Sequence, residues 1–181
     1  MRMSQADKDK SHARIVASAS RLLRERGVDG TSVSDVMNDA GLTHGGFYKH
    51  FASKDALLES ALDASFATFS AMLDGNQPGA TADFLELYLS DRHVRNPGRG
   101  CPVAAVGQDI GRGSKDLKTA FGRGVDHIVD ALAESMDGSA EARRTAALQQ
   151  FSMLVGAVVI ARASDPQTAD EVLAAVSAAV R

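Results

Sequence analysis

A short stretch in the first third of the chain carries residue types that suit contact with DNA. Tyr48 and Lys49 offer a phenol and an ammonium to phosphates, which together with sugars receive about half to two-thirds of protein–DNA hydrogen bonds. Gly45 and Gly46 adjoin them, although each glycine costs a helix about 1 kcal/mol relative to alanine. The pair therefore predicts close approach of the backbone to a partner. The candidate DNA contacts here are Thr43, His44, Gly45, Gly46, Tyr48, Lys49, His50 and Lys54.

Several of these residues also have a simpler interpretation. Lys49 and His50 would equally suit a solvated helix face, and His44 would suit a helix end that makes no base contact. Lys54 would be ordinary in a first helical turn, except that the helix dipole disfavours a cation there. A phosphate bound at the same helix end would explain that lysine.

Two short helices joined by a tight turn must position these residues. A capping box that begins at Ser32 predicts the start of the first helix. Gly41 supplies the left-handed backbone for the turn, and a recognition helix follows at about residues 43–50. Phe47 and Phe51 are predicted to pack inward and hold that helix on its support. This is the layout of a helix-turn-helix.

The segment from about residue 10 to residue 62 resembles the N-terminal domain of the TetR (tetracycline-repressor-like) family of bacterial transcriptional regulators. The resemblance is carried by Thr31, Ser32, Gly41, Gly45, Phe47, Tyr48, Phe51, Ser53 and Lys54. It implies that Thr31 and Ser32 also belong to the DNA-contacting set. It further implies a helical body that binds a small-molecule effector, and repression as the output. Gly46 departs from the family, which often has a small or β-branched residue there.

Apolar residues recur at helical spacing throughout, which predicts an all-α fold of about nine helices. Residues 1–54 are predicted to form the DNA-binding domain, and residues 55–181 the effector-binding and dimerisation domain. The charge agrees with that division, since the first part carries a net +3 and the second a net −6. Helices are expected to start near Ile15, Ser32, Thr43, Ser53, Phe84, Pro102, Leu117, Ser139 and Asp165, with a loop from Asp74 to Ala80.

The composition excludes several classes of protein. The 181 residues include one cysteine, which rules out a disulfide scaffold and a cysteine metal site, and we expect no cofactor or metal. The chain has no run of 18 apolar residues, so no membrane partner is expected. The polar N-terminus lacks the apolar core of a signal peptide, so the predicted location is the cytoplasm.

Cys101 lies between Gly100 and Pro102, at a predicted helix start where backbone N–H groups lower the pKa of a thiol. An alternative function is therefore a thiol-based redox or electrophile sensor with Cys101 as the switch. The simpler interpretation is a small thiol that only packs. The body also offers aromatic and polar residues for an effector pocket, although core packing is the default for the aromatics. The candidates are Phe66, Phe69, Tyr88, His93, Cys101, Phe121 and His127.

The last two predicted helices are too apolar to stay exposed, which predicts that two chains pair through them. Such a homodimer would place two recognition helices on a near-palindromic double-stranded DNA operator. The expected interface consists of Phe151, Leu154, Val155, Val158, Val159, Val172, Leu173 and Val176.

An enzyme is the main rival class, and a helical adaptor that binds only protein is a third. Residues 107–115 (GQDIGRGSK) resemble a phosphate-binding loop, but the step between glycines is four residues, the order is Ser-Lys, and no strand precedes them. We therefore predict that the chain is not an enzyme.

Overall fold

The computed structural model describes residues 4–73 and 80–180, and all regular structure within them is helical. This confirms the predicted all-α fold, while the expected loop at 74–80 falls almost wholly outside the described residues. The elements are α1 (Gln5–Arg26), α2 (Val33–Asp39), η1 (His44–Lys49), α3 (Lys54–Ser70), α4 (Ala80–Tyr88), α5 (Asp91–Arg95), η2 (Pro97–Arg99), α6 (Pro102–Gly111), α7 (Lys115–Glu134), α8 (Ala140–Ala163) and α9 (Pro166–Ala179), where η marks a 3₁₀-helix.

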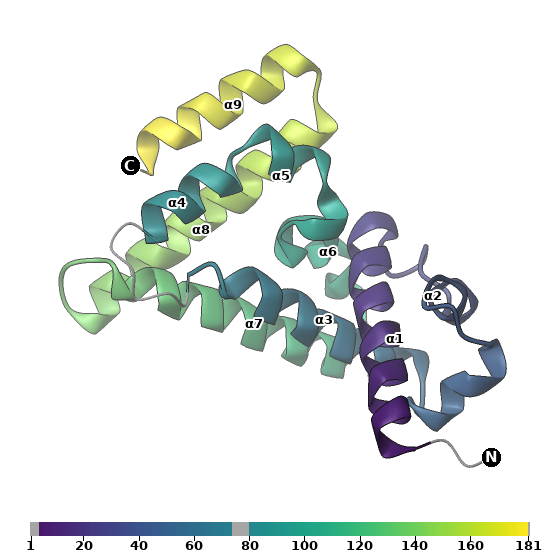
Figure 1. Ribbon diagram of the computed structural model, residues 1–181. Coiled ribbons are helices and arrows are strands. Elements are labelled where there is room, and N and C mark those ends of the chain that lie inside the picture. The colour runs from purple at the N-terminus through teal and green to yellow at the C-terminus, as the bar shows by residue number, and fades with distance from the viewer. Residues whose placement is uncertain (1–3, 74–79, 181) are drawn as a thin grey trace.

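The first three elements form one end of the molecule, and α9 lies at the opposite edge (Figure 1). Helix α3 leaves the N-terminal end and packs along α7, which packs in turn on α8. The shorter helices α4 and α5 lie beside α8, and α6 lies between them and α1. The segment from α5 to α6 therefore joins the two ends of the molecule.

Side-chain caps set most of the helix starts. A capping oxygen accepts a hydrogen bond from the backbone N–H two or three residues on, a contact that contributes about 1 kcal/mol. The capping residues are Ser4, Ser32, Ser53, Ser90, Ser114, Ser139 and Asp165. Four of the predicted starts coincide with these caps because the capping signal is local in sequence.

Helices α3 and α7 approach closely at Gly124. A Cβ at this position would lie 2.2 Å from the ring of Phe66, so any side chain would push the helices apart. Phe66 also packs edge-to-face on Phe121, with ring centroids 5.7 Å apart. These two aromatic rings therefore serve the packing of α3 on α7.

Helix α8 is apolar on two faces. One face is buried against α7 and α9, whereas Val159 and Ile160 on the other are 45% and 46% exposed. Among the described residues, α8 is the one helix long and apolar enough to cross a membrane, and a third of that stretch is buried within the protein. Core helices of water-soluble proteins meet the same criterion, so the exposed face is what requires an explanation.

Candidate nucleic-acid interface and effector cavity

The turn between α2 and η1 has the geometry of a helix-turn-helix. Gly41 adopts a φ of +65°, and the N–H of Leu42 donates to the carbonyl of Met37 at 2.9 Å. A Cβ on Gly41 would lie 2.7 Å from the guanidinium of Arg14, so both backbone angle and space favour glycine. Phe47 is buried, as predicted, and holds η1 against the core.

The recognition helix lies where the sequence placed it, but it is a 3₁₀-helix. The N–H of Gly46 donates to the carbonyl of Thr43 at 2.9 Å, a bond that spans three residues. Two adjacent glycines weaken an α-helix by about 1 kcal/mol each, and 3₁₀ geometry is common in such short segments. The segment is thus helical over the predicted range, with 3₁₀ geometry.

The outward side of η1 carries most of the predicted DNA contacts. Thr43, His44, Gly45 and Lys49 are exposed, and Tyr48 is 73% exposed. A Cβ built on Gly45 would meet no atom within 4 Å. The packing of the protein itself therefore does not require a glycine at this position.

The side chains of two predicted DNA-contacting residues form hydrogen bonds within the protein. Thr31 is 1% exposed, and its hydroxyl donates to the carbonyl of Gly27 at 2.7 Å. The ammonium of the half-buried Lys54 donates to the carbonyl of Val28 at 2.9 Å. The Thr31 side chain cannot reach DNA, and Lys54 ties the start of α3 to the loop after α1. The burial of Thr31 argues against a DNA contact through its side chain, whereas the Lys54 ammonium has two further N–H donors, so its contact with DNA stays a prediction.

Ser32 and His50 border this surface. The exposed Ser32 caps α2, accepting from the N–H of Asp35 at 3.0 Å. His50 is half-buried, 5.9 Å from His12 between ring centroids. Burial, followed by the nearby charges of His12, Lys8 and Lys49, lowers the pKa of His50. The imidazole is thus kept neutral at neutral pH, and any DNA contact through it is a hydrogen bond.

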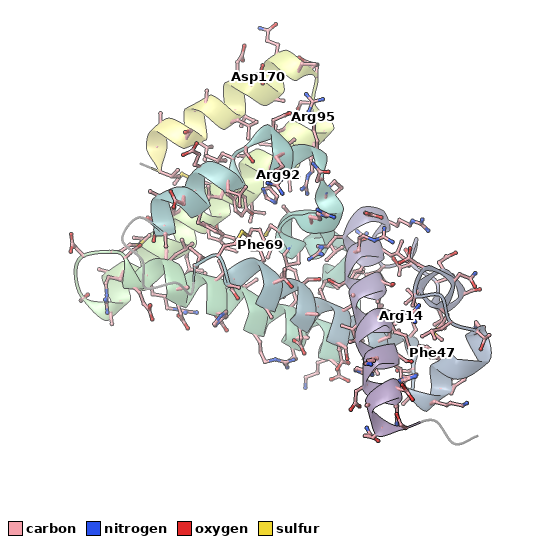
Figure 2. All side chains as sticks on the ribbon, viewed as in Figure 1. Arg14, Phe47, Phe69, Arg92, Arg95 and Asp170 are labelled. Atoms are coloured by element: carbon pink, nitrogen blue, oxygen red, sulfur yellow. The ribbon has the colours of Figure 1, made fainter. Side chains whose placement is uncertain are left out.

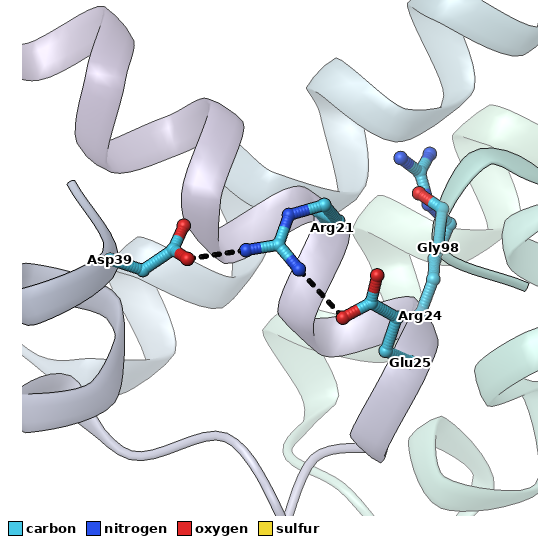
Figure 3. A network of polar contacts seen from close by, with 5 residues as sticks. All are labelled: Arg21, Arg24, Glu25, Asp39 and Gly98. Atoms are coloured by element: carbon cyan, nitrogen blue, oxygen red, sulfur yellow. Dashed lines mark hydrogen bonds and ion pairs between the residues drawn. The ribbon is translucent and has the colours of Figure 1, made fainter.

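One turn of α1 holds both parts of the molecule together. Arg21 binds Glu25 at 2.7 Å and Asp39 at the end of α2 (Figure 3). Arg24, three residues on, donates to the carbonyl of Gly98 in η2 at 3.0 Å. Helix α1 therefore contacts the support of the recognition helix and the body through neighbouring side chains.

A cavity of about 310 Å³ opens between α3, α4, α5 and η2. Three predicted pocket residues line it, namely Phe69, Tyr88 and His93. The other four predicted pocket residues, Phe66, Cys101, Phe121 and His127, do not line this cavity. The full lining is Thr68, Phe69, Met72, Phe84, Leu87, Tyr88, Arg92, His93, Asn96 and Arg99.

His93 closes the inner end of this cavity but has no nitrogen free for a ligand. Its Nε2 accepts from the N–H of Cys101 at 2.8 Å, so the proton must reside on Nδ1. Nδ1 then donates to the carbonyl of Tyr88 at 2.6 Å. Burial lowers the pKa of His93, which agrees with a neutral ring. His93 thus lines the cavity, as predicted, while both of its ring nitrogens are engaged within the protein at the junction of α4, α5 and α6.

Cys101 begins α6, as expected, but its thiol is not activated. The residue is fully buried, and burial raises the pKa of the thiol. The expected lowering was therefore wrong, because loss of water outweighs the nearby Tyr88 hydroxyl and backbone N–H groups. Arg162 of α8 joins α8 to α5 near Cys101, since its guanidinium donates to the carbonyls of Val94 and His93, both at 3.0 Å.

Comparison with known proteins agrees with this architecture. Residues 15–61 match the family model described as "Bacterial regulatory proteins, tetR family". The chain is also 30% identical to the HTH-type transcriptional repressor Rv3405c of Mycobacterium tuberculosis over 173 residues, 93% of this chain and 86% of that protein. The chain belongs to the TetR family.

Two further proteins extend the comparison. Rv0196, an uncharacterized HTH-type transcriptional regulator of Mycobacterium tuberculosis, is 34% identical over 104 residues, so the match spans about half of that relative's length (52%). The crystal structure of the reduced form of Escherichia coli NemR superposes with a TM-score of 0.77 at 20% identity, covering 94% of this chain and 95% of that one. This likeness shows the shared fold.

Family membership also bears on the enzyme alternative. The TetR family is non-enzymatic, which agrees with the prediction that the chain is not an enzyme. The segment 107–115 forms the end of α6, a turn and the cap of α7. It is therefore part of two helix ends.

The predicted dimer residues divide between core and surface. Phe151, Leu154 and Val158 are at most 4% exposed and belong to the core of the TetR protomer, so placing them at an interface was wrong. Val159 is 45% exposed, in agreement with an interface role. The half-buried members are Val155, Val172, Leu173 and Val176.

Sequence reasoning missed three apolar residues on the outer side of α8. Leu148, Met153 and Ile160 are 42%, 39% and 46% exposed. Met153 and Ile160 are seven residues apart and share one side of α8, whereas Leu148 and Val159 share a second side about a third of a turn away, so a broad apolar surface remains uncovered. The period of α8 alone could not separate this outer surface from the buried one, because both faces are apolar.

Proposed function

We propose that this chain is a homodimeric cytoplasmic repressor that binds a near-palindromic DNA operator through η1. A small molecule entering the cavity between α3, α4, α5 and η2 releases it. The observation that carries the DNA-binding role is Gly45, an exposed glycine that the protein's own packing does not require. A backbone lying against DNA accounts for it, since a side chain there would hold the phosphates away.

The remaining surface of η1 fits this role. Thr43 and His44 stand at its N-terminal end, where a recognition helix meets base edges. Tyr48 and Lys49 reach phosphates, and Ser32 offers its backbone N–H at the start of α2, since its hydroxyl donates to the carboxylate of Asp35. In a dimer, two such surfaces about 34–36 Å apart occupy successive major grooves.

Pairing occurs through the outer surface of α8 together with α9. This surface is apolar over Val159 and Ile160, while Ala174, Ala175 and Ala178 of α9 are exposed and small. Small residues allow helices of two protomers to approach closely, and the apolar surface supplies the area to be buried.

Release requires that the cavity and the DNA-binding end share a structural element. Arg99 lines the cavity, and its neighbour Gly98 accepts from Arg24 of α1. A second link runs from α6, where the carboxylate of Asp109 accepts from the N–H of Val28 at 3.1 Å. A ligand that shifts η2 therefore shifts α1, with a coupling free energy of about 1–3 kcal/mol in typical systems.

The test begins with selection of DNA fragments by the purified full-length protein, followed by sequencing. We expect a near-palindrome and an affinity that falls steeply with salt. On the selected operator, Gly45→Ala should lower the affinity at least tenfold while leaving or raising the melting temperature, because alanine favours a helix. Recovery of no sequence, or equal affinity of Gly45→Ala, would contradict the proposal.

A further inference from the structure

We propose that the effector is a small aromatic acid, whose carboxylate binds Arg92 and Arg99 and whose ring lies against Phe69 and Phe84. This inference rests on the proposed function, because it assigns the chemical class of the effector for the same cavity. It follows from the charge of the lining, the arrangement of the rings and the size of the cavity.

The charge of the cavity is wholly positive. Arg92 and Arg99 line it, and among the described residues no aspartate or glutamate does. Within residues 4–73 and 80–180, neither arginine forms an ion pair. The nearby Arg95 differs, since it does not line this cavity and binds Asp91 at 2.6 Å. In Figure 2, Arg92 lies toward Phe69, whereas Arg95 lies near Asp170 of α9.

This positive site contrasts with its surroundings, because residues 55–181 carry a net charge of −6. Two unpaired guanidinium groups beside a concave apolar wall suit a carboxylate, which arginine can bind through two parallel hydrogen bonds. A cationic ligand would be repelled. A neutral apolar ligand would leave both arginines unused.

The inner wall is a cluster of aromatic rings. Phe69 packs edge-to-face on Phe84 at 5.5 Å and on Tyr88 at 5.6 Å between centroids. Such an arrangement offers ring faces and edges to a further planar ring. The buried hydroxyl of Tyr88 lies beside the thiol of Cys101.

The size of the cavity limits the ligand to one or two fused rings. At about 310 Å³ it stands at the lower end of small-molecule sites. It is about twice the ~150 Å³ of an engineered cavity that holds benzene. A two-ring acid such as 2-naphthoate is therefore a suitable probe.

The experiment compares 2-naphthoate with its neutral isostere 2-naphthamide by isothermal titration calorimetry on the full-length protein. We expect the acid to bind at least tenfold more tightly, with an affinity that falls as salt rises. Arg92→Gln and Arg99→Gln should each weaken the acid about tenfold or more and leave the amide little changed. Arg95→Gln is the matched control and should behave as the wild type.

Several outcomes would overturn the inference. The amide binding as well as the acid would show that charge does not select the ligand. Unchanged binding of the acid in both Arg92→Gln and Arg99→Gln would place its carboxylate elsewhere. Binding of neither probe at millimolar concentration would show that the cavity does not take this class. All three variants alter exposed side chains, and equal melting temperatures without ligand will establish that they fold.

The same proteins separate this inference from the proposed function. Selected DNA that binds the protein without any binding of the acid contradicts the ligand class alone. Tight binding of the acid to a protein that selects no DNA contradicts the repressor. If both bind, 2-naphthoate should release the operator from the wild type and from Arg95→Gln, and less readily from Arg92→Gln and Arg99→Gln.

Discussion

At the residue scale, two lysines only five residues apart have different surroundings. Lys49 is exposed on η1, whereas the ammonium of Lys54 donates to the carbonyl of Val28. Residue type does not distinguish them, and both were predicted to contact DNA. The difference arises because the loop after α1 leaves a carbonyl within reach of one of them.

Substitution of the two lysines should therefore have different consequences. Lys49→Ala should weaken binding to all DNA sequences alike, lower the salt slope by about one unit and leave the melting temperature unchanged. Lys54→Ala should lower the melting temperature by about 2–4 °C, since it removes a hydrogen bond worth about 1 kcal/mol. Fluorescence anisotropy and thermal melts measure both. A changed base preference in Lys49→Ala would contradict its phosphate role.

His93 makes the stability of the protein depend on pH. Burial holds the pKa of His93 below the ordinary value near 6.5. Just below pH 6.5, the unfolded chain therefore binds a proton on His93 that the folded chain does not bind. The contribution of His93 to stability should be complete above about pH 7.5 and should fall as the pH drops through 6.5 toward the lower pKa of the folded state. His93→Gln should flatten this dependence in melts at pH 5.5 and 7.5, whereas His44→Gln, on the exposed end of η1, should retain it. An unchanged pH dependence in His93→Gln would assign the effect to other groups.

At the scale of the element, α8 shows how neighbouring valines serve different purposes. Val158 is fully buried and Val159 is 45% exposed, although they are adjacent and identical. Val158→Asp places a charge in the core, which costs several kcal/mol, so the protomer should unfold. Val159→Asp places it on the outer surface, so the protomer should keep its helical circular dichroism and sediment as a monomer. A folded dimer of Val159→Asp would move the interface away from this surface.

Short polar elements are the ones that the sequence did not predict. Helix α5 (Asp91–Arg95) has five residues and too few apolar positions to show a helical period, so the sequence pattern does not predict it. Arg92 and Arg99 were likewise not expected in the pocket, because a charged side chain is by default solvated. Local signals such as the cap at Ser32 and the inward Phe47 were predicted, since they depend on near neighbours in the chain.

At the scale of the whole molecule, two long-range hydrogen bonds join the N-terminal end to the body. Arg24 of α1 donates to the carbonyl of Gly98 in η2, and the N–H of Val28, in the loop after α1, donates to Asp109 of α6. These contacts join residues more than 70 positions apart in the chain. Sequence reasoning named the two domains but not the contacts between them, because such pairings appear only when the chain has folded.

Because Cys101 is buried, the reactivity of its thiol reports how often the structure around it opens. The thiol is inert to solvent reagents while α4, α5, α6 and α8 stay together, and it becomes reactive only when that corner separates. The rate at which a thiol reagent labels the native protein therefore measures the frequency of opening, and no other cysteine competes for the reagent. A ligand that fills the adjoining cavity should slow this labelling. The labelling rate therefore reports whether the cavity is occupied, in a protein that has no tryptophan to serve as a fluorescent probe.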